Sequence, residues 1–160
     1  MTQYKPFFNY LNSAIASSSE SVIVEEGSGT GLVSSLIPRE DKQLILVDNN
    51  VDMLRLSDRN VTGKNVKRVL CDLTRFSHNG GLVHSHGVLE HLSPGDIQQV
   101  IRRQKQCYSR VIHYVPSNRY TYKSFGNELL LSKQQWVKLV HPDKVIEFNN
   151  GYDLILSWGG

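Results

Sequence analysis

The sequence predicts an α/β fold, namely a three-layer sandwich around a mostly parallel seven-stranded sheet with an antiparallel last strand. Short, continuously apolar runs such as Val22–Val24 and Leu44–Val47 are typical of strands buried on both faces of a parallel sheet. Segments with helical spacing of apolar residues alternate with these runs. Near the end, an Asn-Gly pair separates the apolar runs 144–148 and 153–158, which indicates an antiparallel hairpin.

Length and composition indicate one ordinary globular domain, residues 1–160. The net charge of +3, from 18 basic and 15 acidic residues, is too small to demand a nucleic acid partner. The two cysteines, Cys71 and Cys107, lack the spacing of a metal site or a disulfide framework, so we expect reduced thiols. The N-terminus lacks the apolar core of a signal peptide, and no apolar run approaches the ~18 residues of a membrane span. We therefore expect a cytoplasmic protein.

The first element expected is an amphipathic helix over Tyr4–Ile15, whose apolar residues recur three or four positions apart. Pro6 lies in its first turn, where proline is tolerated. We expect this helix to pack on the sheet as part of the core. The alternative is that its aromatic side chains also cover the mouth of a cofactor site.

The stretch Val22–Gly31, VIVEEGSGTG, is a strand followed by a glycine-rich loop. Alternating glycines let a backbone approach a ligand closely because they lack a Cβ and tolerate positive φ. The stretch does not match the G-x-G-x-x-G fingerprint of dinucleotide-binding proteins, because Leu32 occupies the place of the third glycine. It also lacks the Gly-Lys pair of a phosphate-binding P-loop. An acid two residues before G-x-G-x-G suits a ligand with a cation and a ribose. The alternative is a glycine-rich turn without a ligand. The apolar residues of 32–37 predict a helix behind the loop, which Pro38 helps to end.

Two further strands are expected at Gln43–Asp48 and Val66–Leu73. Ligands of open α/β sheets bind at the carboxyl ends of the strands, so Asp48 is placed to accept hydrogen bonds from ribose hydroxyls. The alternative role for Asp48 or Asn49 is to cap the helix that carries Met53. The connection 74–80 is short and polar, so we expect a reduced crossover there.

The fourth strand and its following loop span Leu82–His91. Three histidines fall here, but no carboxylate or cysteine completes a clear ligand set, so we expect no metal. A helix over Ile97–Tyr108 and a strand over Arg110–Val115 follow. The long aromatic segment 116–136 suggests a binding segment, with a packed surface Ω-loop as the alternative. Within it, Ser132–Gln135 resembles a capping box before a last helix.

Four segments together resemble the class I S-adenosylmethionine-dependent methyltransferases. They are Glu25–Gly31, Leu46–Asn50, Cys71–Leu73 and Ser85–Leu92, in the order of the family and within a resemblance that runs from about Ser21 to Val140. The resemblance implies a Rossmann-like fold and S-adenosylmethionine as cofactor. It implies that Asp72 accepts the adenine amino group, that Leu73 packs on the ring, and that His86 contacts the amino acid moiety. The full set of expected cofactor residues is Glu25, Gly27, Ser28, Gly29, Gly31, Asp48, Asn49, Met53, Asp72, Leu73 and His86.

The implied reaction is methyl transfer to a small molecule or sugar precursor. The Asn/Asp-Pro-Pro-aromatic and Pro-Cys motifs of nucleic acid methylases are absent after the fourth strand. If the acceptor needs a base, the candidates are His86, Glu90, His91 and Tyr120. Glu26 and Gly81 depart from the family pattern. A second hypothesis is a non-catalytic module of the same fold that binds the cofactor or a partner protein. A third, a nicotinamide-dependent oxidoreductase, is opposed by the glycine spacing.

Overall fold

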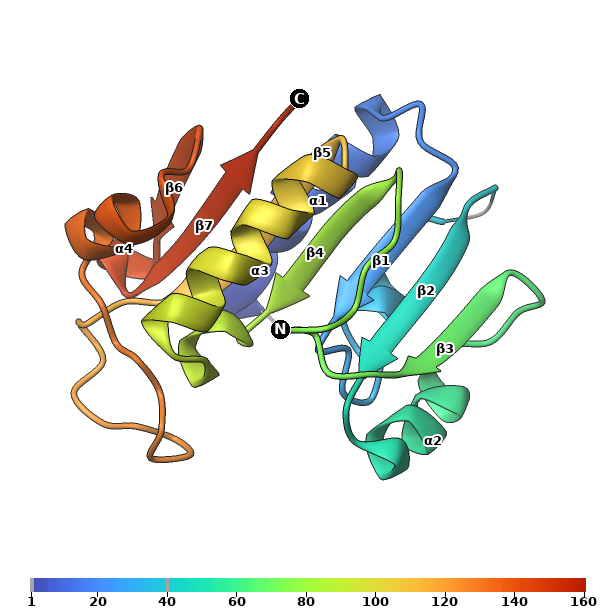
Figure 1. Cartoon of the computed structure of the whole chain (residues 1–160), viewed down its shortest axis with the longest axis horizontal. Helices are drawn as coiled ribbons and strands as arrows, with labels where there is room; N and C mark the ends of the chain where they lie inside the picture. Colours follow the sequence, from blue (N-terminus) through green and yellow to red (C-terminus); the bar gives the residue numbers. More distant parts are fainter. Residues whose placement is uncertain (1, 40) are drawn as a thin grey trace.

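The computed structural model describes residues 2–39 and 41–160 and contains one seven-stranded sheet with the order β3-β2-β1-β4-β5-β7-β6 (Figure 1). Strands β1 to β5 are mutually parallel, whereas β7 runs antiparallel to both β5 and β6. This arrangement confirms the predicted fold class. The strands are β1 (Val22–Glu26), β2 (Gln43–Asp48), β3 (Val66–Leu70), β4 (Leu82–His86), β5 (Arg110–Pro116), β6 (Lys144–Phe148) and β7 (Asp153–Trp158).

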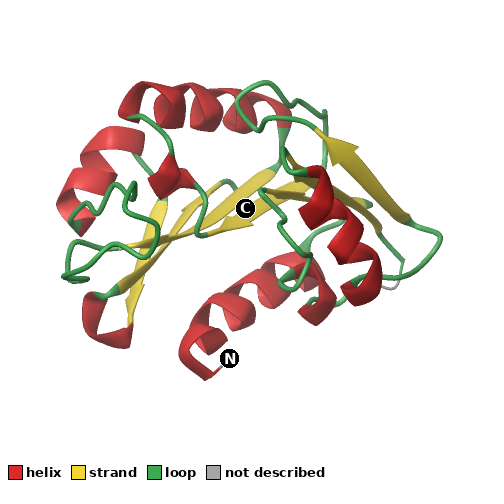
Figure 2. Ribbon diagram, turned by 90° about the horizontal axis from the view of Figure 1, so that it is seen from below, coloured by secondary structure: helices red, strands yellow, loops and turns green. Residues whose placement is uncertain are grey.

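Helices cover both faces of the sheet and complete the three layers (Figure 2). The α-helices are α1 (Lys5–Ser17), α2 (Val51–Asn60), α3 (Pro94–Cys107) and α4 (Lys133–Val140). Short 3-10 turns are η1 (Thr2–Tyr4), η2 (Ser34–Leu36), η3 (Leu89–His91) and η4 (Asn149–Gly151). Apolar residues of α1 and α2 pack on one face of the sheet, and those of α3 and α4 pack on the other. No helix in the described part of the chain has the length and apolar character needed to cross a membrane.

The helix at the N-terminus packs mainly as core, as expected. Phe7 and Leu11 are completely buried on the sheet face that α1 covers. Tyr4 just precedes the helix and contacts His86 and Tyr114 edge to face, with ring centroids 4.6 and 5.3 Å apart. The beginning of the chain therefore also reaches the carboxyl end of β4.

Side-chain caps begin three of the helices. The capping box predicted at Ser132 and Gln135 is present at α4. Ser93 caps α3. Asn50 caps α2 by accepting hydrogen bonds from the backbone N–H groups of Asp52 and Met53, at 2.9 and 3.2 Å. The cap is therefore one residue beyond Asn49, and Asp48 remains available for another role.

The helix predicted behind the glycine loop is absent, and that expectation was wrong. Turns and the short η2 occupy this stretch, while Leu32 and Leu36 are exposed. Ser34 donates its hydroxyl hydrogen bond to Glu25, and Ser35 donates to the Leu32 carbonyl oxygen at 2.6 Å. Serine side chains that bond locally compete with helix formation, which explains why the apolar spacing misled here.

One strand boundary differs from the sequence interpretation, whereas the two strands of the final hairpin have the expected bounds. Strand β3 ends at Leu70, so Cys71–Leu73 belong to the following loop. The final hairpin turns through η4, in which Asn149 and Asn150 have φ of 49° and 55°. Asparagine tolerates this left-handed conformation better than most residues. The reduced crossover between β3 and β4 is as expected, with no helix between residues 70 and 82.

Candidate functional site

The glycine loop lies at the edge of the sheet where β1, β2 and β4 end (Figure 1). The backbone N–H groups of Gly27 and Ser28 both donate to the Val47 carbonyl oxygen, at 2.8 and 2.9 Å. Gly27 has φ of 70°, and a Cβ there would come within 2.6 Å of Val88. Glycine is therefore required for both conformation and space.

Asp48 holds the middle of this loop. Its carboxylate accepts hydrogen bonds from the N–H of Gly29 at 2.7 Å and from the N–H of Asn50 at 2.8 Å. Gly29 has φ of 51°, and a Cβ added there would meet no atom within 4 Å. The space beside Gly29 is thus open, and each carboxylate oxygen of Asp48 keeps capacity for a further donor.

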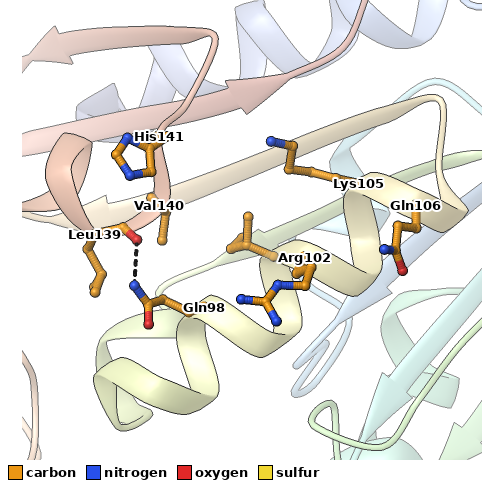
Figure 3. Close-up of a pocket in the computed structure, with 8 residues that line it drawn as sticks. Gln98, Arg102, Lys105, Gln106, Leu139, Val140 and His141 are labelled. Carbon is orange, nitrogen blue, oxygen red and sulfur yellow. Dashed lines mark hydrogen bonds between the residues drawn. The ribbon is translucent and has the colours of Figure 1, made fainter.

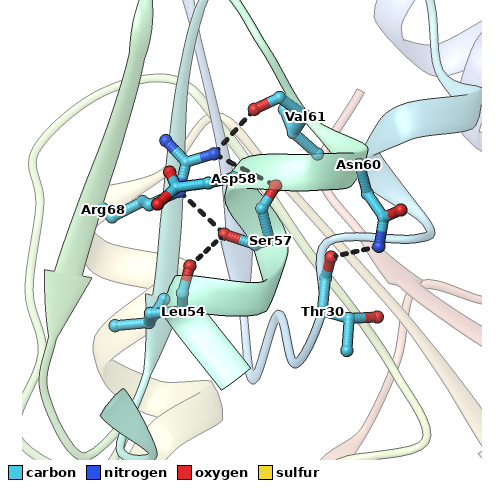
Figure 4. A network of polar contacts seen from close by, with 7 residues as sticks. All are labelled: Thr30, Leu54, Ser57, Asp58, Asn60, Val61 and Arg68. Carbon is cyan, nitrogen blue, oxygen red and sulfur yellow. Dashed lines mark hydrogen bonds and ion pairs between the residues drawn. The ribbon is translucent and has the colours of Figure 1, made fainter. Parts of the chain in front are cut away.

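A polar network at the end of α2 supports the loop from behind (Figure 4). Arg68 of β3 donates to the Ser57 hydroxyl at 2.7 Å and to the Val61 carbonyl oxygen at 2.6 Å. Asn60 donates to the carbonyl oxygen of Thr30 in the loop at 2.9 Å. Gly31 packs directly on this turn, because its Cβ would lie 2.9 Å from Val61. The role of Gly31 in the structure is therefore close packing.

A cleft of about 310 Å³ opens beside the loop. Four of the expected cofactor residues line it: Gly27, Asp48, Asn49 and Leu73. Its other lining residues are Cys71, Gly87, Val88, His91 and Leu92. Arg103 of α3 donates to the carbonyl oxygens of Leu73 and Thr74 and so ties the loop after β3 to the helix layer.

The remaining expected cofactor residues do not line this cleft. Glu25 is buried under the loop, and burial raises its pKa to about 8 despite the opposing hydrogen bond from Ser34. Asp72 accepts hydrogen bonds from the hydroxyl and N–H of Thr74, at 2.7 and 2.8 Å, and these lower its pKa. The Ser28 hydroxyl is buried without a hydrogen-bond partner among the described residues. Met53 lies in the first turn of α2.

A second cavity of about 380 Å³ adjoins the first, and Gly87 and His91 line both. All four candidate bases, His86, Glu90, His91 and Tyr120, line this second cavity. Aromatic residues from the N-terminus, from β5 and from the segment after β5 complete much of its wall: Tyr4, Tyr114, Tyr122 and Phe125. Tyr122 and Phe125 are 71% and 82% exposed, so they do not belong to the core.

The candidate bases differ in their surroundings. His86 stacks on Tyr114 with ring centroids 4.1 Å apart, and burial lowers its pKa to about 4. The hydroxyl of Tyr120 donates to buried Asp153 at 2.8 Å. Burial is the main cause that raises the pKa of Tyr120, and the neighbouring Asp153 carboxylate raises it further. Burial raises the pKa of Glu90 to about 7. Of these three side chains, only Glu90 titrates near neutrality, which is the range suited to a base.

Glu128 is a lining residue that the sequence did not single out. It comes close to Glu90 because the segment after β5 returns to η3, where the N–H of Leu129 donates to the Glu90 carbonyl oxygen at 2.7 Å. His91 also joins this segment, through a hydrogen bond of 2.8 Å between its Nδ1 and the side-chain oxygen of Asn127. A lone acid in an irregular segment carries no sequence signal, so only the tertiary structure reveals it.

A further cavity of about 600 Å³ lies elsewhere, between α3 and the end of α4 (Figure 3). Its polar lining includes Gln98, Arg102, Lys105 and His141. None of the expected site residues lines it. Arg102 and Lys105 are exposed side chains in the C-terminal half of α3, where cations are favoured by the helix dipole.

His84, which shares a strand face with His86, is completely buried and lines neither of the two adjoining cavities. Burial lowers its pKa to about 3, so the ring is neutral at physiological pH. Across residues 2–39 and 41–160, no group of three or more His, Cys, Asp or Glu side chains is placed to hold a metal ion.

No family model and no curated protein sequence matches this chain. Solved structures do match. The mitomycin 7-O-methyltransferase superposes with a TM-score of 0.71 at 12% identity, covering 94% of this chain and 52% of that one. Magnesium protoporphyrin IX methyltransferase from Synechocystis PCC 6803, with bound S-adenosylmethionine, superposes with a TM-score of 0.73 at 13% identity. The match covers 98% of this chain and 79% of that one. The small RNA methyltransferase HEN1 superposes with a TM-score of 0.80 at 14% identity, and the match covers 98% of this chain and 26% of that one.

These structures share the architecture of this chain at identities that carry information about fold alone. The chain spans about half of the mitomycin enzyme and a quarter of the RNA enzyme. The similarity therefore does not identify the methyl acceptor of this chain. The structure agrees with the sequence motifs in three features: the mostly parallel sheet, the glycine loop at the end of β1 and the antiparallel β7. The chain therefore has the fold of the class I S-adenosylmethionine-dependent methyltransferases.

Proposed function

We propose that this protein transfers the methyl group of S-adenosylmethionine to a small-molecule acceptor. The observation that carries the proposal is the pair of adjoining cavities that share Gly87 and His91. One lies at the glycine loop and Asp48, and the other holds all four candidate bases. A transfer between two bound molecules requires such neighbouring sites, because the enzyme acts mainly by holding the reactants in line.

The residues of the glycine loop and of the first cleft beside it fit the proposed cofactor. Open space beside Gly29 allows a ligand to approach the backbone, and the Asp48 carboxylate has capacity for the ribose hydroxyls. Leu73 offers an apolar surface for the adenine ring. The buried, unpartnered hydroxyl of Ser28 supplies a further polar group at the loop. The cofactor would supply an electrophilic methyl group on a sulfonium sulfur.

Within the second cavity, Glu90 is the residue best suited to remove a proton from the acceptor. Its pKa of about 7 leaves a substantial carboxylate fraction at neutral pH, whereas the low pKa of His86 makes that ring a weak base. The hydroxyl of Tyr120 is a hydrogen-bond donor to Asp153, so we assign Tyr120 to the wall of the cavity. His91 lies between the two cavities and is positioned to orient Glu90, whose Oε1 is 4.0 Å from the His91 Nε2.

Calorimetry with S-adenosylmethionine, S-adenosylhomocysteine and NAD tests the cofactor. We expect both sulfur compounds to bind and NAD not to bind. Mass spectrometry of a panel of small acceptors, incubated with S-adenosylmethionine, then tests transfer. Binding of NAD alone would contradict the proposal. Binding of S-adenosylhomocysteine without methylation of any acceptor, together with a stable protein partner, would favour a non-catalytic binding module instead.

A further inference from the structure

The second cavity contains two acidic side chains, each with one carboxylate oxygen that lacks a hydrogen-bond donor among the described residues. Glu90 and Glu128 are 4% and 6% exposed, and both line the cavity. In each of them, the Oε2 atom is buried and has no hydrogen-bond partner among the described residues. Because a buried carboxylate oxygen without a donor is costly, these two atoms mark a place where a ligand with donors is stabilised.

The charge of the cavity favours a cationic or strongly donating ligand. No lysine or arginine is among the described residues that line it, so a phosphate or carboxylate would meet acids without a compensating cation. Burial opposes ionisation of Glu128. Backbone N–H groups of the segment nevertheless donate to its carboxylate, among them the N–H of Phe125 at 2.8 Å, and these hydrogen bonds hold the pKa of Glu128 below its ordinary value. Glu128 is therefore ionised at neutral pH.

The aromatic walls agree with the same class of ligand. Tyr4, Tyr120 and Tyr122 line the same cavity as the two acids, and electron-rich aromatic faces attract ammonium groups. The Asp153 carboxylate accepts hydrogen bonds from the hydroxyls of Tyr114 and Tyr120, at 2.7 and 2.8 Å. These hydrogen bonds point the hydroxyls of both tyrosines toward Asp153, so neither hydroxyl proton faces the ligand.

We infer that the acceptor of the proposed methyl transfer is a small amine, held by Glu90 and Glu128. This inference rests on the proposed function and names its substrate class. An uncharged primary amine has two N–H donors and one lone pair, so it can satisfy both orphan carboxylate oxygens and still attack with its nitrogen. A hydroxyl acceptor has one donor and would leave one of the two oxygens unsatisfied.

The bound ammonium loses one proton to the Glu90 carboxylate. The nitrogen lone pair then forms the new bond to the methyl carbon. The carbon–sulfur bond breaks, and its electron pair stays on sulfur, which becomes a neutral thioether. The product is an N-methylammonium ion, and the proton on Glu90 leaves to solvent. Glu128 retains its charge throughout and stabilises the ammonium before and after the transfer.

A matched series of probes tests the inference by calorimetry on protein saturated with S-adenosylhomocysteine. Tyramine, tyrosol and 4-hydroxyphenylacetate share a phenol ring and differ by an ammonium, a hydroxyl or a carboxylate. We expect tyramine to bind about tenfold or more tightly than tyrosol, and 4-hydroxyphenylacetate to bind least tightly. Equal affinities for tyramine and tyrosol, or tighter binding of the acid, would overturn the inference.

Variants connect that preference to the two acids. Glu90→Gln and Glu128→Gln should each reduce the tyramine affinity by about tenfold or more and leave the tyrosol affinity nearly unchanged. Glu147→Gln is the control, because it makes the same chemical change at a surface acid that pairs with Lys133. If neither cavity variant changes the preference for tyramine, the assignment of the two acids is wrong.

The two proposals fail in different ways. If S-adenosylhomocysteine binds but the amine preference is absent, the substrate class is wrong and methyl transfer stands. If S-adenosylhomocysteine does not bind, but tyramine binds the ligand-free protein through both acids, the amine site stands and the proposed function fails.

Discussion

Replacement of Asp48 by alanine should weaken cofactor binding while the fold persists. In the free protein, this carboxylate already holds Gly29 and Asn50 through hydrogen bonds of 2.7 and 2.8 Å. The change therefore removes the proposed ribose acceptor and also releases the loop that lies beside the proposed cofactor cleft. Hydrogen bonds to a charged group contribute about 1.5–3 kcal/mol, so we expect S-adenosylhomocysteine to bind about 10- to 100-fold less tightly.

Calorimetry measures this affinity, and circular dichroism establishes that the variant is folded. Asp52→Ala is a suitable control, because Asp52 is an exposed acid of the adjacent helix that pairs with exposed Arg55 at 3.3 Å. Exposed pairs of this kind contribute at most about 1 kcal/mol to stability. Wild-type affinity in a folded Asp48→Ala protein would refute the assigned role, as would an equal loss in both variants.

Three further predictions follow from the site. Gly29→Val should abolish S-adenosylhomocysteine binding more completely than Gly63→Val, because the new side chain would fill the open space beside the loop at a φ of 51°; calorimetric affinities that match in the two variants would contradict this. Because Glu25 has a pKa raised to about 8 by burial, the free energy of unfolding should fall as the pH rises from 5 to 8. Glu25→Gln should reduce that fall by about 3 kcal/mol in urea titrations, and an unchanged pH dependence would argue against this burial effect. Replacing Tyr122 and Phe125 by alanine should spare S-adenosylhomocysteine affinity and depress turnover or acceptor affinity; a lowered melting temperature with unchanged turnover would instead indicate a packed loop.

The sequence predicted the sheet well because its strands carry a strong local signal. Continuous apolar runs such as Leu44–Val47 are stable only when both faces are covered, which is the situation in a parallel sheet between two helix layers. The same reasoning failed behind the glycine loop. There the apolar spacing of 32–37 was genuine, but Ser35 bonds locally to the Leu32 carbonyl oxygen and Ser34 bonds to Glu25 of β1, and turns take the place of a helix.

The proposed cofactor cleft could be predicted in part, because its residues lie where strands end. Gly27 follows β1, Asp48 ends β2 and Leu73 lies in the loop after β3, and all three line one cleft, since the carboxyl ends of parallel strands meet at one edge. Glu25 and Asp72 match the family motifs equally well but do not line it. Glu25 lies beneath the loop, and Asp72 bonds to its own turn.

By itself, the sequence determined the order of the strands along the chain, the glycine loop and the chemical types of the residues around it, because these depend on neighbours close in the chain. The acceptor side depended on the tertiary structure. Glu90 and Glu128 belong to segments separated by β5 and become neighbours only where the chain returns to η3. Burial then moves the pKa of Glu90 to about 7, and burial is a property of the packed molecule.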